Sequence, residues 1–459
     1  MWTRRAFTAM FMAGVAASRA SLGQGQPSAA RAGRRAEVES LRRFAESTHP
    51  RGREAAARED WRQRWDAHAV AAEALSDGDY FVRTRRALGW FKDGHTTVLP
   101  FAFAGGVPPA LASGPFGVEL PIRARLFHDG AWITAAGRNA TQLLGTRIGR
   151  IGDLDAAALT RAFAQDWPGN DAWAHRWAGD AFSSPALLQA LGAVRDASAP
   201  LRMVVVDRSG RHIEMTIHPV PAGDDEPRPL ERVACEREDW ARAAASGNFA
   251  RVLAEARALY LCIDDMDDVA GKTFEAFTRE AFAAMETPGL RRLVVDLRRN
   301  GGGNNYLGEP LRKRIARSPF NRPGGLYVLT GPMTFSAAQN LATRLERETF
   351  ATFVGEPTGG APNHYGDAAV FKGEATGLVS IVSALAWFDS YPTDSRPWIL
   401  PDLPVPERYA DWQAGRDPAL QAALSHEADT TVDELDRERV FYFRRPSQER
   451  DWGPFWRTA

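Results

Sequence analysis

The stretch Leu326–Leu345, LYVLTGPMTFSAAQNLATRL, predicts a strand, a tight turn and a helix in direct succession. Four apolar or aromatic residues at its start are typical of a short buried strand, and apolar residues then recur at helical spacing after the turn. Ser336 lies at the junction, where the unpaired N–H groups of a helix N-terminus favour negative charge. Ser336 is therefore a candidate nucleophile. The alternative is that Ser336, or Thr334 before it, only caps the helix.

Strands and helices alternate on both sides of this stretch. The predicted elements are a strand at 259–263, a helix near 273–285, a strand at 293–297, a helix after residue 305 and a strand at 351–354. This alternation predicts an α/β layer with a largely parallel sheet.

Two other patterns precede this region. Residues 36–75 are charged and alanine-rich, which indicates two or three helices, whereas short alternating strands and glycine turns follow from Val118. The second pattern resembles a PDZ-like module, which binds peptides at a sheet edge. We predict a signal peptide and linker at 1–28, a helical region at 29–100, a PDZ-like β-rich module at 101–222, an α/β core at 223–410 and a C-terminal tail at 411–459.

The N-terminus predicts export from a bacterial cell. Arg4 and Arg5 precede a short apolar run, and small residues follow with a candidate cleavage position after Ala20. This is a signal-peptide pattern of the twin-arginine type, and its apolar run is too short for a stable membrane span. We expect a periplasmic or secreted protein. The alternative is a basic, amphipathic start to the first helix.

Composition narrows the classes of function. The 459 residues suit two or three domains, and 57 basic against 57 acidic residues give no support for nucleic-acid binding. Cys235 and Cys262 are too few for a disulfide framework or a four-cysteine zinc site, and the apolar run around Cys262 predicts a buried free thiol. The acidic run at 264–268 lacks the EF-hand pattern, so we expect a solvated loop and no metal or cofactor.

A glycine run provides a second candidate element of the site. In VVDLRRNGGG, residues 294–303, a buried strand ends in three glycines, which allow backbone N–H groups to approach an anion closely. The run lacks the spacing of a phosphate loop, and a serine follows at the next strand–helix junction, so we favour an oxyanion hole. Asp296 and Arg298 are expected to be structural.

Four motifs now occur in a distinctive order: VVDLRRNGGG at 294–303, LTGPMTFSAAQNLA at 329–342, FVGEPTGG at 353–360 and ILPDLPV at 399–405. They resemble the tail-specific, or C-terminal-processing, serine peptidases and their tricorn-core and retinoid-binding-repeat relatives. The resemblance extends more weakly to DGHTTV at 93–98 and to the PDZ-like segment. It implies a crotonase- or ClpP-like core, Ser336 as nucleophile, and the backbone N–H groups of Gly302 and Ala337 as oxyanion donors.

The sequence differs from many bacterial members of the family at the residue that acts as the general base. Their lysine in the loop after GEPT is replaced by Ala361, and no lysine lies between Ser336 and Lys372. In the tricorn-like branch the resemblance assigns the base to a histidine, which His95 matches, and the orienting acid to a residue near Asp394. His364, in the loop that carries the lysine in relatives, is the alternative base.

These observations predict an exported serine peptidase that cleaves peptides or proteins through an acyl-enzyme on Ser336, with its oligomeric state left open. Two alternatives stay open. Retinoid-binding relatives share this core, so the chain could be a non-catalytic ligand- or peptide-binding protein. It could also be an esterase or amidase acting on small substrates.

Overall fold

The structure is a computed structural model that describes residues 31–427 except 166, 225–226, 245–246 and 269–271. The described chain divides into two units. Unit 1 holds the described residues up to Leu230 together with Tyr365–Ala386, and unit 2 holds Glu231–His364 with those from Trp387 onward. The predicted signal peptide and the end of the predicted tail lie outside the described residues.

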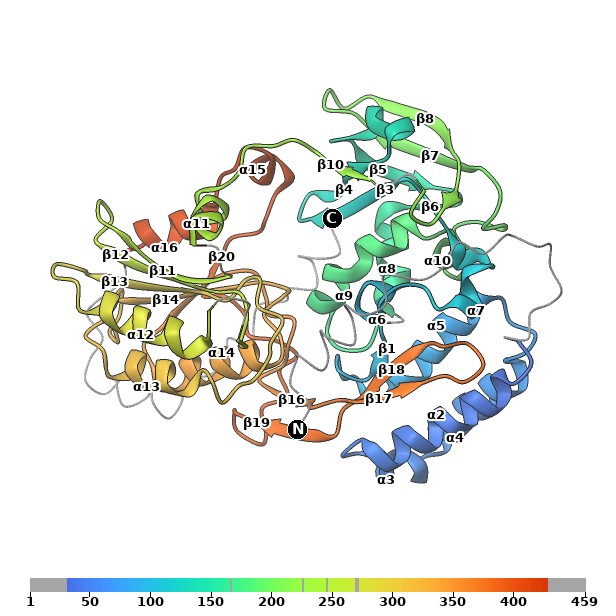
Figure 1. The fold of residues 1–459 in the computed structure, drawn as a ribbon, viewed down its shortest axis with the longest axis horizontal. Coiled ribbons are helices and arrows are strands. Elements are labelled where there is room, and N and C mark those ends of the chain that lie inside the picture. Colours follow the sequence, from blue (N-terminus) through green and yellow to red (C-terminus); the bar gives the residue numbers. More distant parts are fainter. Residues whose placement is uncertain (1–30, 166, 225–226, 245–246, 269–271, 428–459) are drawn as a thin grey trace. The chain divides into compact units, whose positions relative to one another are not determined.

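Unit 2 is built on a six-stranded sheet of order β11-β12-β13-β14-β15-β20 (Figure 1). The strands from β12 to β20 are parallel, and β11 adds an antiparallel edge. Their bounds are β11 Asn248–Leu253, β12 Ala258–Ile263, β13 Arg292–Asp296, β14 Leu326–Thr330, β15 Thr352–Gly355 and β20 Leu403–Pro404. The predicted α/β layer with a largely parallel sheet is confirmed.

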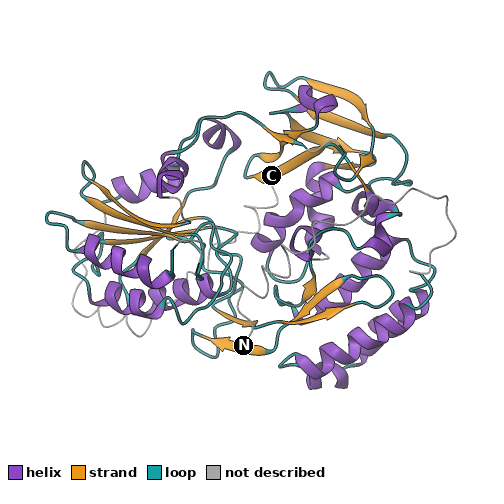
Figure 2. Ribbon diagram, in the orientation of Figure 1, coloured by secondary structure: helices purple, strands orange, loops and turns teal. Residues whose placement is uncertain are grey.

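Helices cover both faces of this sheet, as Figure 2 shows by colour. One face carries α12 (Phe274–Met285), α13 (Glu309–Arg317) and α14 (Ala337–Glu348), and the other carries α11 (Glu236–Ala244) and α16 (Pro418–Ser425). Alternate residues of each strand enter different cores: Leu259 and Leu261 pack toward the first set of helices, whereas Tyr260 and Cys262 pack toward the second. Burial on both faces explains why these strands are continuous apolar runs.

Unit 1 begins with helices that share one core with a small sheet. The helices are α2 (Arg34–Thr48), α3 (Gly52–Ala57), α4 (Glu59–Ala71) and α5 (Asp77–Leu88). Their buried aromatic residues, including Trp61 and Trp65, pack together with Val98 and Val382 of the sheet β1-β18-β17. The bounds of that sheet are β1 Thr97–Val98, β17 Ala369–Lys372 and β18 Val379–Val382.

A second sheet of unit 1 follows along the chain, with the order β10-β4-β5-β7-β8, in which β3 also pairs with β4 and β6 with β5. Its main strands are β3 (Ile122–Phe127), β4 (Gly130–Ala136), β5 (Arg147–Ile151), β7 (Leu201–Val206) and β8 (His212–Ile217), all paired antiparallel. Helices α8 (Ala156–Gln165), α9 (Asp171–Ala178) and α10 (Pro185–Ala190) accompany it. The hairpin predicted at 202–217 is present as β7 and β8.

The segment Tyr365–Ala386 is distant in sequence from the rest of unit 1 but belongs to it. Its strand β18 pairs antiparallel with β1, with Thr97 opposite Ile381, and also with β17. The chain enters and leaves this segment through β16 (Asn363–Gly366) and β19 (Leu385–Phe388), which form a two-stranded sheet. Among the described residues, no helix is both long and apolar enough to cross a membrane.

Candidate active site

The Ser336 turn is held to the neighbouring strand by a buried threonine. β14 ends at Thr330, and the hydroxyl of Thr334 donates to the carbonyl of Leu297 at 3.0 Å while accepting the Gly331 N–H at 3.1 Å. Leu297 follows β13 directly. The threonine therefore joins the ends of two adjacent parallel strands, which fixes the turn at the carboxyl edge of the sheet.

Ser336 has a backbone conformation that residues other than glycine rarely adopt. Its φ is 54° and its ψ −125°, and it immediately precedes α14. Its hydroxyl makes no capping hydrogen bond to that helix, and Thr334 is bonded elsewhere, so the capping alternative is wrong for both residues. Strained backbone of this kind is concentrated at functional sites. Ser336 is half-buried, which leaves part of it in contact with solvent.

Gly302 lies against Ser336. A Cβ atom placed on Gly302 would lie 2.5 Å from the Cβ atom of Ser336, 3.0 Å from its Oγ atom and 3.1 Å from the Ala337 nitrogen. Gly302 also has a φ of +114°, which strains any side chain. The position therefore requires glycine on two counts. The structure brings together three of the predicted site residues: Ser336, Ala337 and Gly302.

Asn300 holds the glycine run in place. Its side chain is fully buried, donates to the carbonyl of Ile263 at 2.9 Å and accepts the Gly302 N–H at 2.8 Å. Its carbonyl accepts the Phe335 N–H at 3.1 Å, so the same residue also contacts the Ser336 turn. The N–H of Gly302 thus already has an acceptor, and an oxyanion would have to share it.

The loop after β15 passes beside the Ser336 turn. The Gly360 N–H donates to the carbonyl of Thr334 at 3.1 Å, and a Cβ atom on Gly360 would lie 2.8 Å from the side chain of Gln339. Further along this loop, Nδ1 of His364 is 3.0 Å from the carbonyl of Ala361. A carbonyl only accepts, so Nδ1 is the donor. His364 belongs to the same unit as Ser336, and its Nδ1 is hydrogen-bonded to the Ala361 carbonyl.

Asp394 is bound by an arginine. Its Oδ1 accepts from Arg396 Nε at 3.0 Å, and its Oδ2 accepts from Arg396 Nη2 at 2.8 Å and from the Ser390 hydroxyl at 2.6 Å. The same guanidinium holds both oxygens of Glu346 at 2.9 Å. Burial opposes the charge of Asp394, but the hydrogen bonds from Arg396 and Ser390 prevail and lower its pKa.

His95 belongs to unit 1 and lies in the turn between α5 and β1. Its backbone N–H donates to Oδ1 of Asp93 at 3.0 Å, and its Nδ1 is 3.8 Å from the same oxygen. Asp93 is buried, and sequence reasoning did not select it as a site residue. The available signal was the Asp-x-His spacing in DGHT, because aspartate side chains commonly accept the N–H two residues on.

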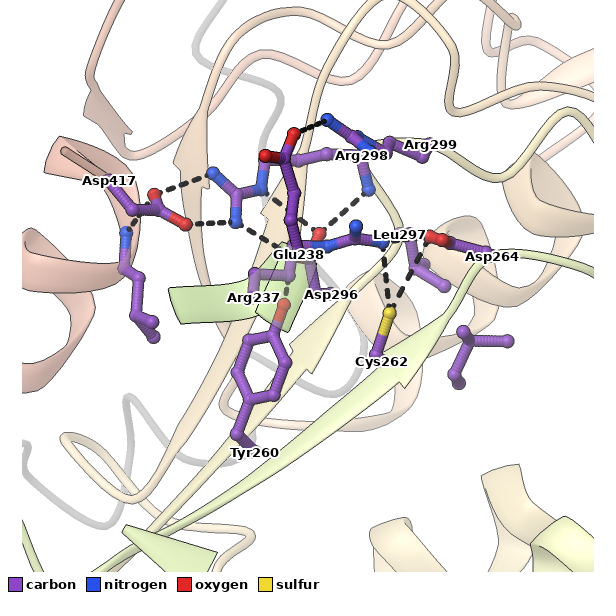
Figure 3. A network of polar contacts seen from close by, with 12 residues as sticks. Arg237, Glu238, Tyr260, Cys262, Asp264, Asp296, Leu297, Arg298, Arg299 and Asp417 are labelled. Atoms are coloured by element: carbon purple, nitrogen blue, oxygen red, sulfur yellow. Dashed lines mark hydrogen bonds and ion pairs between the residues drawn. The ribbon is translucent and has the colours of Figure 1, made fainter. Parts of the chain in front are cut away.

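A buried polar network ties the carboxyl ends of β12 and β13 to two helices, and Figure 3 shows how its side chains converge. Asp296 accepts from the hydroxyl of Tyr260 and from Nη2 of Arg298 at 2.7 Å. Arg298 also binds both oxygens of Asp417, the N-cap residue of α16, at 2.7 and 2.8 Å. These contacts give Asp296 and Arg298 the structural role that the sequence predicted.

Arg237 of α11 closes the network on its other side. Its guanidinium contacts Asp264 and lies 3.0 Å from the sulfur of Cys262 (Figure 3). Cys262 is a buried free thiol, as predicted, and its pKa is raised by burial and by the negative charge of Asp264. The acidic run at 264–268 also contacts the backbone at the start of α12, where Asp268 accepts the Phe274 N–H at 2.8 Å.

Several solved structures are similar to this one. Mature CPAF, solved in complex with lactacystin, has a TM-score of 0.57 and 10% sequence identity over 86% of this chain and 98% of that chain. The photosystem II D1 C-terminal processing protease has a TM-score of 0.38 and 13% identity over 81% and 93% of the two chains. The tricorn protease has a TM-score of 0.40 and 12% identity over 89% of this chain and 37% of that one.

The protein has an α/β fold of the kind found in mature CPAF. The match spans nearly all of both chains. No protein-family model matches the sequence, and no curated protein matches it.

Proposed function

We propose that the protein is a serine peptidase that cleaves peptide bonds through an acyl-enzyme on Ser336. The observation that carries the proposal is the conformation of Ser336 at the start of α14, strained and pressed against Gly302. A hydroxyl that does not cap its helix, next to a helix N-terminus and a glycine run, is suited to attack a carbonyl and to place the resulting oxyanion among N–H donors.

In this proposal the Ala337 N–H and the Gly302 N–H bind the developing oxyanion. The Gly302 N–H does so as a three-centre bond shared with Oδ1 of Asn300, the arrangement its existing contact suggests. Loss of one such donor typically costs roughly 10²–10³-fold in rate. The core of unit 2 is then a crotonase- or ClpP-like peptidase core, and the β-rich module of unit 1 is a PDZ-like domain that holds the substrate peptide.

The proposed general base is His95, which takes the proton of Ser336 and later returns it to the leaving amine. The sequence assigns the orienting carboxylate to Asp394 and the alternative base to His364. Because Nδ1 of His364 donates to Ala361, its Nε2 would be the nitrogen available for that role. The N-terminal signal pattern also leads us to propose that the protein is exported and is periplasmic or secreted.

A fluorophosphonate probe, which reacts with activated serines, tests the nucleophile. We expect stoichiometric labelling of the purified protein, loss of labelling in Ser336→Ala, and retention in Ser318→Ala, whose hydroxyl bonds a carbonyl at the end of α13. Labelling that persists in Ser336→Ala contradicts the proposal. Mature CPAF was solved with lactacystin, so lactacystin is a second probe of the same serine.

The base and the substrate class are tested separately. His95→Ala should abolish labelling and His364→Ala should preserve it; the reverse result would make His364 the base. Hydrolysis of a peptide library, set against a panel of small esters, distinguishes a peptidase from an esterase. Binding of an apolar ligand without labelling or hydrolysis would instead indicate a non-catalytic binding protein.

A further inference from the structure

Asp93 is the centre of a buried cluster in unit 1. We call the five residues His49, Asp93, His95, Thr96 and Ser383 the Asp93 cluster. Oδ2 of Asp93 accepts from the hydroxyls of Thr96, at 2.6 Å, and Ser383, at 2.5 Å. Ser383 lies 290 residues further along the chain, just after β18, and its N–H donates to Thr96 at 3.1 Å. The pairing of β1 with β18 therefore fixes this carboxylate from both sides.

His49 faces the same oxygen from the end of α2. Its Nδ1 accepts the Arg51 N–H at 3.0 Å, so the ring proton is on Nε2, which lies 3.6 Å from Oδ2 of Asp93. The ring also stacks on Phe91 with centroids 3.8 Å apart. His49 thus faces Oδ2 with a ring N–H, at a distance beyond an ordinary hydrogen bond.

His95 faces the other oxygen. Oδ1 accepts the His95 backbone N–H at 3.0 Å and lies 3.8 Å from Nδ1 of the His95 ring, which is 13% exposed. An anionic oxygen on this side favours the proton on Nδ1, and the lone pair that a base needs is then on Nε2. Nδ1 and Oδ1 are beyond hydrogen-bond distance at 3.8 Å, so Asp93 acts on the ring through its charge, which stabilises the imidazolium that forms when His95 accepts a proton.

The charge of Asp93 is well supported. Burial raises its pKa, but the contacts with His49, His95 and Ser383 outweigh burial and hold the pKa below its usual range. The other titratable groups near the cluster are Tyr365 of β16, whose ring is 4.7 Å from that of His49, and Arg51, which pairs with Glu54 at 2.7 Å.

Asp394, the carboxylate that the sequence assigns to orienting His95, has other hydrogen-bond partners. Both of its oxygens are bonded to Arg396, which also holds Glu346. To orient an imidazole, Asp394 would have to exchange a bidentate ion pair for a single hydrogen bond. Ion pairs of this fork-to-fork geometry are among the stronger polar contacts in proteins.

We infer that Asp93 is the residue that positions His95, directing Nε2 outward as the base and stabilising its protonated form, and that Asp394 instead fixes the Arg396–Glu346 ion pair. This inference rests on the proposed function, because it gives His95 a reaction to serve. Asp93 acts through His95 and is a positioning residue.

The test uses the full chain labelled with 15N-histidine, with the His95 signal assigned from a His95→Gln variant. We expect the wild-type His95 ring to carry its proton on Nδ1. Asp93→Asn should change this tautomer, because the anionic oxygen that favoured a proton on Nδ1 is gone. The rate at which the fluorophosphonate phosphonylates Ser336, with loss of fluoride, should fall roughly 10²–10⁴-fold.

The pH profile provides a readout that a purely structural role would not move. In Asp93→Asn the pH profile of kcat/KM should change, because the charged group that faces the proposed base is gone. Asp394→Asn is the matched control, and it should leave the tautomer and the pH profile unchanged. An unchanged tautomer and profile in Asp93→Asn, or a change in Asp394→Asn instead, overturns the inference.

A third variant covers the case in which Asp93→Asn does not fold. Ser383→Ala removes one donor and leaves the carboxylate, so the proton of His95 should stay on Nδ1; loss of that tautomer in Ser383→Ala overturns the inference. Failure of the proposed function would give a different result. The wild type would not be labelled by the fluorophosphonate, or Ser336→Ala would still be labelled. The two failures can be told apart because the NMR measurement of the His95 tautomer does not depend on Ser336.

Discussion

Gly302 and Ser336 touch so closely that no side chain fits between them: a Cβ atom on Gly302 would lie 2.5 Å from the Cβ atom of Ser336. Gly302→Ala should therefore displace Ser336 and slow fluorophosphonate labelling by roughly 10²-fold or more. Gly210→Ala is the matched control. Gly210 also has a positive φ, +84°, but nothing lies within 4 Å of its added Cβ. It should lose only about 1–2 kcal/mol of stability and keep its labelling rate.

The backbone of Ser336 predicts a gain from glycine. Its φ of 54° and ψ of −125° strain a residue with a Cβ atom by about 1–3 kcal/mol, and glycine is free of most of that strain. We expect Ser336→Gly to be at least as stable as Ser336→Ala in urea unfolding, although both are inactive. A Ser336→Gly protein clearly less stable than Ser336→Ala would show that the turn is unstrained.

Asn300 should matter for both stability and rate. In Asn300→Ala the Ile263 carbonyl and the Gly302 N–H lose their buried partner, at about 1–3 kcal/mol for each group left unsatisfied. The labelling rate should fall as the glycine run loosens. Asn304→Ala, which removes only an acceptor for the Tyr306 N–H, should change neither by a measurable amount. Equal effects of the two substitutions would contradict the anchoring role.

The pairing of Arg298 with Asp417 should make stability depend on pH. Burial opposes the charge of Asp417, but Arg298 lowers its pKa in the folded state. A lowered folded pKa gives stability that is complete above the unfolded carboxyl pKa, about 3.9, and is lost as pH falls through the folded value. Urea midpoints should therefore fall below about pH 4.

Asp417→Asn keeps the helix cap but removes the charge. It should cost about 3 kcal/mol at pH 7 and weaken this acid sensitivity. Asp411→Asn, at an exposed partner of Arg416, is the control and should cost less than about 1 kcal/mol. If the two variants have equal midpoints, the network in Figure 3 contributes little to stability.

Cys262 should be inert in the folded protein. The thiol is fully buried, and burial raises its pKa, so little of the reactive thiolate forms. Mass spectrometry after iodoacetamide treatment should find Cys262 unmodified in the native state and modified after denaturation. The half-buried Cys235 is the internal comparison. Rapid native modification of Cys262 would contradict the packing of Arg237 against it.

The strand, turn and helix at 326–345 could be predicted because their signals are local. The inner strands of the unit 2 sheet, β12 to β15, are buried on both faces, so their sequences are nearly continuous apolar runs, and each helix repeats apolar residues at helical spacing. The glycine at 302 was also predictable as a close approach, although its specific neighbour, Ser336, follows only from the fold.

Contacts between distant segments could not be read in this way. The hydroxyl of Ser383 meets Asp93 across 290 residues, and nothing in either neighbourhood indicates the other. The assignment of Tyr365–Ala386 to unit 1 has the same origin, since strand pairing at long range leaves no local pattern. The engagement of Asp394 by Arg396 is close in sequence, but bidentate geometry depends on backbone direction rather than composition.

The strand pairing of Thr97 with Ile381 has a consequence for how the protein is made. During synthesis the N-terminal helices leave the ribosome long before β18 exists, so unit 1 cannot complete its small sheet until almost the whole described chain has been translated. Domains otherwise tend to fold as they emerge, and such distant pairing slows the process. The contacts that hold Asp93 therefore form late. If the proposed peptidase activity depends on His95 as the base, a partly synthesised chain lacks a positioned proton acceptor and is inactive until β18 has paired.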